Sequence, residues 1–140
     1  MGAGEDLIEL FKTEKATTEE LLPLIDAKSA KVVGMRNKLP LHYACEYKAS
    51  IAVVEKLLEA NPAAIRHKDD GQYLPLHWAC QWGAEDAVIR KLLEVYPEAA
   101  NEPNKLNKKP SHLAVMYQAT KEVQGMIKEK QEALTAVAAG

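Results

Sequence analysis

Apolar residues recur three and four positions apart along most of this chain, which is the spacing of one face of a helix. One stripe of this kind lies at 41–45, and a second lies at 51–58 after a short break at 48–50. The same two stripes return at 76–80 and at 88–93. The pattern therefore predicts pairs of short helices that are joined by tight loops.

The helix pairs belong to a repeat with a period of 35 residues. Leu-Pro-Leu-His occurs at 39–42 and at 74–77, and Lys-Pro-Ser-His holds the same place at 109–112. Alignment of 39–73 with 74–108 finds 15 identical residues in 35 positions. Because one such unit cannot bury its apolar faces alone, we expect the units to stack into a solenoid.

Prolines and polar residues mark the limits of the helices. Pro40 and Pro75 suit the first position of a helix, where a backbone N–H would be unpaired in any case. Pro62 and Pro97 indicate that the second helix of each unit has already ended. The polar segment 66–73 has Asp-Gly at its centre, which is a strong turn signal. Each unit is therefore predicted to be helix, loop, helix and extended turn.

This combination resembles the ankyrin repeat. The resemblance rests on Pro-Leu-His-x-Ala-Cys after an Asp-Gly turn, followed by a helix with Val and Leu-Leu. It covers 39–128 well and 5–38 weakly, and the Trp, Gly and Tyr pattern of the tetratricopeptide repeat is absent. The resemblance implies an all-α fold, an ankyrin-like helical-hairpin solenoid of about four units.

The chain departs from the ankyrin pattern in three respects. Its period is 35 residues, whereas the usual period is about 33. Leu39 and Leu74 stand where the family usually has Thr, so a hydroxyl cap is lost at the helix start. The segment 104–108 lacks the Asp-Gly pair, and we therefore expect the last turn to be open or irregular.

Both ends of the chain are predicted to be modified units. Thr17 and Glu20 form a candidate capping box for a helix that Pro23 should end or kink. A long, charged helix is predicted from Glu122 to Ala139, and such a polar face suits a terminal unit. We expect one domain over 1–140 whose outer two units act as caps, with units near 5–38, 39–73, 74–108 and 109–140.

Composition and charge restrict the class of partner. The formal net charge is -2, so a polyanion or an anionic membrane is not an expected partner. No apolar run approaches the roughly 18 residues of a membrane span, and the first residues do not form a secretory signal. We expect a soluble intracellular monomer, cytoplasmic or nuclear, that needs no cofactor and binds neither nucleic acid nor membrane.

His42, His77 and His112 form a ladder at the repeat spacing. Two ligands of one zinc ion lie within about 4 Å of each other, whereas packed helices lie about 8–10 Å apart. We therefore predict no metal site. The ankyrin resemblance implies a structural role, in which each histidine bonds to backbone near its own helix start and to the next unit.

Cys45 and Cys80 follow two of these histidines by three residues, which leaves a Cys–His enzyme as an alternative. The pair recurs with the repeat, and no orienting group or oxyanion site accompanies it. We therefore interpret both thiols as small buried apolar residues and predict no catalytic residue.

An aromatic residue recurs at one position of three units, at Tyr47, Trp82 and Tyr117. The ankyrin resemblance implies that this position and the one before it face a concave groove, and Tyr and Trp are frequent in binding hot spots. The alternative, in which the aromatics pack against the loop between the helices, stays open here. The groove candidates are Glu46, Tyr47, Gln81, Trp82, Met116 and Tyr117.

The turns between units form a second candidate surface, since ankyrin-like proteins often use them together with the groove. The candidates at the turn tips are His67, Lys68, Asp70, Gln72, Glu102, Asn104 and Lys105. We predict a non-enzymatic protein–protein interaction module that presents a concave surface to a protein partner. The alternative is a purely structural repeat segment, or a scaffold without a cognate ligand.

Overall fold

The computed structural model describes the backbone of residues 3–139 and the side chains of 4–137, so Met1, Gly2 and Gly140 lie outside it. Residues 3–139 contain helices and no strand, which confirms the predicted all-α fold. The α-helices are α1 (Ala3–Lys12), α2 (Thr18–Leu21), α3 (Pro40–Glu46), α4 (Ile51–Ala60), α5 (Pro75–Trp82), α6 (Asp86–Val95), α7 (Pro110–Met116) and α8 (Lys121–Ala139). Short 3-10 helices join them: η1 (Leu22–Leu24), η2 (Ser29–Lys31), η3 (Met35–Asn37), η4 (Pro62–Arg66) and η5 (Pro97–Asn101).

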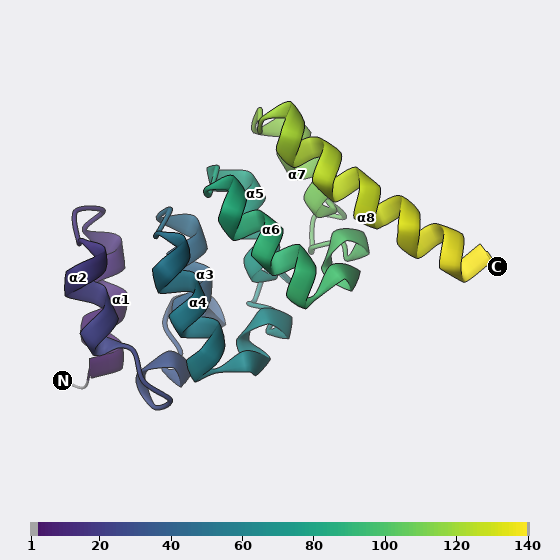
Figure 1. The fold of residues 1–140 in the computed structure, drawn as a ribbon. Helices are drawn as coiled ribbons and strands as arrows, with labels where there is room; N and C mark the ends of the chain where they lie inside the picture. Colours follow the sequence, from purple (N-terminus) through teal and green to yellow (C-terminus); the bar gives the residue numbers. More distant parts are fainter. Residues whose placement is uncertain (1–2, 140) are drawn as a thin grey trace.

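The α-helices form hairpins that stack side by side (Figure 1). The first helices α1, α3, α5 and α7 lie in one layer, and the second helices α2, α4, α6 and α8 lie in the other. Each first helix contacts the first helix of the next hairpin, and α4 and α6 contact their neighbours in the same way. The two termini lie at opposite ends of the stack, as a solenoid requires.

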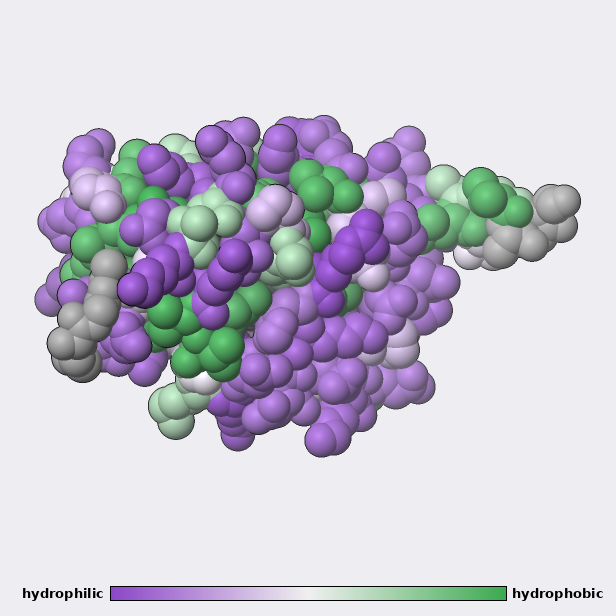
Figure 2. Space-filling view, turned by 90° about the horizontal axis from the view of Figure 1, so that it is seen from below, coloured by the Kyte–Doolittle hydropathy of each residue, from purple (hydrophilic) through white to green (hydrophobic). Residues whose placement is uncertain are grey.

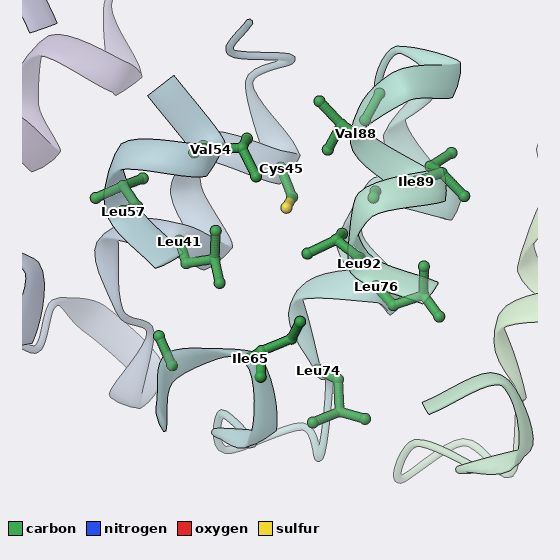
Figure 3. Packing of buried hydrophobic residues seen from close by; sticks show 14 of the residues in the cluster. Leu41, Cys45, Val54, Leu57, Ile65, Leu74, Leu76, Val88, Ile89 and Leu92 are labelled. Carbon is green, nitrogen blue, oxygen red and sulfur yellow. The ribbon is translucent and has the colours of Figure 1, made fainter. Parts of the chain in front are cut away.

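One continuous apolar core runs between neighbouring hairpins (Figure 3). The stripes predicted from the sequence supply it, because their residues point from both layers into the space between two units. Complete burial of one Leu, Ile or Val side chain contributes about 1.5–3 kcal/mol to the free energy of unfolding. The buried residues of the second and third hairpins include Leu41, Cys45, Val54, Leu57, Leu76, Val88, Ile89 and Leu92.

A 3-10 turn follows each second helix of the central units, and the apolar pattern does not predict it. η4 and η5 begin at Pro62 and Pro97, directly after α4 and α6 have ended. The prolines thus end one helix and begin the next, because their fixed φ suits a first helical position. Ala99 and Ala100 in η5 are buried, and this turn packs against α8.

A buried histidine bonds to the backbone at the start of each central first helix. The Nδ1 atoms of His42 and His77 accept hydrogen bonds from the backbone N–H groups of Leu39 (3.2 Å) and Leu74 (2.9 Å). A backbone N–H can only donate, so Nδ1 is unprotonated and the neutral ring carries its proton on Nε2.

That Nε2 atom reaches the segment that leads into the next unit. In His42 it lies 3.0 Å from the carbonyl oxygen of His67, and in His77 it lies 2.8 Å from that of Glu102. His112 keeps the first bond, to Lys109 N–H at 3.0 Å, but its ring is exposed. The corresponding acceptor would fall at Val137, where the chain is still helical in α8.

The turns between units, which we call fingers, are the segments 34–38, 69–73 and 104–108. Each is closed by a backbone bond between its ends, from Gly34 N to Lys38 O and likewise in the other two. Neighbouring fingers are also joined: Asp70 N–H donates to Arg36 O, and Lys105 N–H donates to Gly71 O, both at 2.9 Å. These bonds recur with the 35-residue period, so they hold the fingers in register.

The expectation that the last turn is open or irregular is wrong. The Oδ1 atom of Asn104 accepts hydrogen bonds from Leu106 N–H and Lys108 N–H at 2.9 and 3.0 Å. Asp69 closes its own finger through the same pair of bonds, and both fingers place their fourth residue at positive φ, 62° and 61°. In these two fingers the side-chain oxygen of the first residue, which Asp and Asn both supply, accepts two backbone N–H groups, and Gly71 is not the left-handed residue.

The two end units agree with their predicted form. Thr17 caps α2 through a 3.2 Å bond from Glu20 N–H, and α2 gives way to a 3-10 turn before Pro23. In α8, Lys128 and Gln124 occupy places that are apolar and buried in α4 and α6. The outer face of the last unit is therefore more polar than the faces within the stack. The end of α8 extends beyond the body of the stack (Figures 1 and 2).

Acid should destabilise the protein through the buried histidines. Burial lowers the pKa of His42 and of His77 to about 4, below the value of about 6.5 for an exposed histidine. Because the folded pKa lies below the unfolded one, the contribution is complete above about pH 6.5 and is lost as the pH falls toward 4. Urea titration across this window should show a loss of about 2–3 kcal/mol per histidine.

The variant His77→Gln tests the source of this loss. It should lower stability at neutral pH and also flatten the pH dependence between about 6.5 and 4, because one titrating ring is gone. His112→Gln, which changes an exposed ring of the same ladder, is the matched control and should keep the full slope. An unchanged slope in His77→Gln would contradict the assignment.

Candidate protein-binding surface

Three neighbouring first helices end at an aromatic residue. Tyr47 and Tyr117 cap α3 and α7, and Trp82 is the last residue of α5. The chain then turns through a left-handed residue, at Lys48 (φ 58°), Gly83 (φ 74°) and Gln118 (φ 60°). Because the cap geometry repeats with the sequence period, the three aromatics leave the first-helix layer at equivalent places.

The three aromatic side chains differ in exposure. Trp82 is 46% exposed and Tyr117 is 50% exposed, and Met116 beside Tyr117 is exposed as well. Tyr47 is half-buried and packs against the core. The binding and packing interpretations therefore apply to different residues: Tyr47 fits packing, while Trp82 and Tyr117 are accessible to a partner.

Tyr47 is half-buried and lies beside the first hairpin. It lines a small hollow of about 290 Å³ together with Leu10, Phe11 and Leu21 from α1 and α2. Trp82 and Tyr117 do not line this hollow. Burial raises the pKa of the Tyr47 phenol, and the nearby carboxylates of Glu46 and Glu14 add to this shift.

A second hollow of about 360 Å³ lies between the ends of α3 and α5. Tyr47 and Trp82 line it, together with Glu14, Glu46 and Lys48. Glu46 is ion-paired with Lys38, while Glu14 and Lys48 are exposed. The hollow therefore combines two aromatic rings with a carboxylate of α3, a carboxylate of the loop between α1 and α2, and the side chain of Lys48.

Beneath this hollow lies a buried cation that sequence reasoning missed. The Lys38 ammonium lies 4.3 Å from the ring centre of Tyr43 and 4.2 Å from that of Trp78, and it pairs with Glu46. The indole Nε1–H of Trp78 donates to Asp69 Oδ2 at 2.8 Å. Lys38 is only 6% exposed, although a lysine side chain is almost always exposed to solvent. Asp69 could have been found, because it aligns with Asn104 at the repeat spacing.

Comparison with known families decides what these hairpins are. The family model described as ankyrin repeats (3 copies) matches residues 14–94 and again residues 41–137. The chain belongs to the ankyrin repeat family. Ankyrin repeats are generally protein–protein interaction modules. No curated protein matches the chain significantly. Among the described residues, no helix has the length and the apolar character to cross a membrane.

The turn-tip residues that the sequence predicts as contacts of this ankyrin stack are not all accessible. Asn104 is buried and closes its own turn, so we remove it from the candidate contacts. Lys68 and Glu102 pair with each other at 3.1 Å, and the His67 ring bonds to Asn37 O at 2.8 Å. Exposed side chains remain at the other three predicted positions, which are Asp70, Gln72 and Lys105.

The two polar groove candidates of the central ankyrin units are also partly engaged. Glu46 and Gln81 are both half-buried, and Glu46 is committed to Lys38. The Gln81 side-chain oxygen is buried and has no hydrogen-bond partner among the described residues. A polar group in this state is able to accept a hydrogen bond from a partner that reaches it.

The two thiols of this ankyrin stack lie in the core. Burial raises the pKa of Cys45 to about 12 and raises the pKa of Cys80 as well. A nucleophilic cysteine needs the opposite shift, since the thiolate is the reactive form. The burial of both thiols therefore argues against the Cys–His alternative. Among the described residues, no three His, Cys, Asp or Glu side chains gather as metal ligands would.

Alanine substitutions should separate the packing aromatic from the exposed one. Tyr47→Ala should cost about 2 kcal/mol of unfolding free energy, because it removes a ring that packs on the core. Trp82→Ala should cost less than about 1 kcal/mol, because nearly half of the residue is exposed to solvent. Urea denaturation measures both. A loss above about 3 kcal/mol for Trp82→Ala would mark a core residue and remove it from the candidate surface.

Proposed function

We propose that this ankyrin domain binds a protein partner across a concave surface that runs along the ends of α3, α5 and α7. We call it the groove surface, and its residues are Tyr47, Trp82, Met116 and Tyr117; Asp70, Gln72 and Lys105 of the fingers, which precede the first helices, are further candidate contacts. The observation that carries the proposal is the adjacent exposure of Trp82, Met116 and Tyr117 on two helices that pack together. Family membership supports the general role.

The physical reason is the nature of the exposed side chains. Tyr, Trp and Met are enriched in protein interfaces, and Tyr and Trp carry much of the binding energy there. Their helices are fixed by the core and by the finger bonds, so little ordering entropy is lost on binding. The chain thus presents a rigid apolar patch that is costly to leave in water.

The energetic centre of the groove surface is expected at α5 and α7. Tyr47 already packs on the first hairpin, so a partner gains less from covering it. Val115 is also exposed, but it takes the repeat position of the buried Cys45 and Cys80, so we do not count it with the groove surface. The sequence alone treats the three aromatics as equal binding candidates, whereas their burial distinguishes Tyr47 from Trp82 and Tyr117.

Two further properties belong to the same proposal. We propose a monomer, which the polar side chains of Gln124 and Lys128 on the outer face of the last unit support. We also propose a cytoplasmic or nuclear location. Two free, buried thiols suit the reducing conditions of those compartments.

Selection of peptides tests the proposal without a known partner. The full chain is presented to a random library of 12-residue peptides, and the affinities of the selected peptides are measured by calorimetry. We expect Trp82→Ala and Tyr117→Ala each to weaken binding at least tenfold, because hot-spot truncations cost about 1.4 kcal/mol or more. Circular dichroism confirms that each variant is folded.

Val95→Ala is the matched control. Val95 is 46% exposed, like Trp82, but it lies at the end of α6 in the other helix layer. It should leave the affinity unchanged. If the selected peptides bind all four proteins equally, or if no peptide is selected, the groove surface is not the binding site and the purely structural role is favoured.

A further inference from the structure

The hollow between Tyr47 and Trp82 has the same side-chain types as a cation site that is already occupied in this chain. One helical turn earlier on the same two helices, Tyr43 and Trp78 hold the Lys38 ammonium between their rings, beside Glu46. Tyr47 and Trp82 follow those aromatics by four residues each, so both pairs lie on the same faces of α3 and α5. The Tyr–Trp pair is thus repeated one turn further along.

The two carboxylates near Tyr47 and Trp82 also favour the binding of a cation. Glu14 and Glu46 both line the hollow. Glu46 already faces Lys38, whereas Glu14 has no ion-pair partner among the described residues. Lys12, the other nearby cation on α1, is paired with Glu9 at 3.3 Å. A cation is attracted to the faces of aromatic rings even at exposed sites, and a carboxylate beside it adds to this attraction.

We infer that this hollow, lined by Tyr47, Trp82, Glu14 and Glu46, receives a lysine or arginine side chain of the protein partner. The inference rests on the proposed function and adds the chemistry of one contact: a basic side chain between two aromatic rings at the edge of the groove surface. Among residues 4–137 no cation lies over the ring of Tyr47 or Trp82, whereas Lys38 lies over the rings of Tyr43 and Trp78.

Lys48 provides a second test of the site, because its positively charged side chain lines the same hollow and would repel an incoming cation. An incoming cation must displace or tolerate it, so removing this lysine should favour binding. The backbone at Lys48 has φ 58°, a left-handed conformation that glycine adopts without strain. Lys48→Gly therefore removes the competing charge without disturbing the fold. Glu14→Gln removes the attracting charge, so the two variants should act in opposite directions.

The direct experiment titrates the full chain with N-acetyl-arginine amide and follows the indole N–H signal of Trp82 by nitrogen–proton correlation spectra. N-acetyl-citrulline amide, which has the same shape and no charge, is the control ligand. We expect a saturable shift of Trp82 with the arginine compound alone, with a Kd in the millimolar range. Glu14→Gln should weaken it about twofold to fivefold, and Lys48→Gly should strengthen it. Glu59→Gln, an exposed carboxylate on α4, should leave it unchanged.

The outcomes separate this inference from the proposed function. Equal shifts with both compounds, or no dependence on Glu14, would overturn the inference. If the selected peptides need Trp82 and Tyr117 yet bind unchanged when their Lys and Arg residues become citrulline or norleucine, the groove surface stands and the cation site fails. If arginine binds at Trp82 while no peptide depends on the groove surface, the proposed function fails alone.

Discussion

Two buried imidazole rings hold the central part of this stack together, and each does so with both of its nitrogens. Nδ1 of His42 or His77 receives the backbone N–H at the start of a first helix, and Nε2 reaches the carbonyl of the segment that leads to the next unit. One neutral ring therefore fixes where a helix begins and where the next unit lies. The arrangement needs a buried ring that stays neutral, and the low pKa values of both histidines reflect that requirement.

The fingers and the groove surface depend on this constraint. Since each unit is fixed against the next by the same bonds, the fingers meet through equivalent backbone groups, from Asp70 to Arg36 and from Lys105 to Gly71. The ends of the first helices are likewise held at one register, which brings their aromatic residues to a common face. The aromatic positions are regular because the histidine and finger bonds are regular.

Sequence reasoning predicts the features that each unit carries within itself. Helix starts at Pro40 and Pro75, the apolar stripes and the capped α2 all follow from local spacing and cap chemistry. What it misses depends on contacts between units or on interchangeable groups. The side-chain oxygen of Asn104 closes its finger as that of Asp69 does, and a search for Asp-Gly alone does not find this equivalence. The burial of Lys38 depends on aromatic rings from two different units, so no local pattern reveals it.

The difference between Tyr47 and the later aromatics has the same origin. A repeat in the sequence implies equal environments only in the interior of a long array, and this stack is short enough for its ends to matter. Tyr47 is half-buried beside the first hairpin, whereas Met116 and Tyr117 of the last unit are exposed. The groove surface is therefore graded from a half-buried, carboxylate-lined end to an exposed apolar end. A partner that fits it should match that gradient, with a basic side chain toward the first hairpin and an apolar segment toward α7.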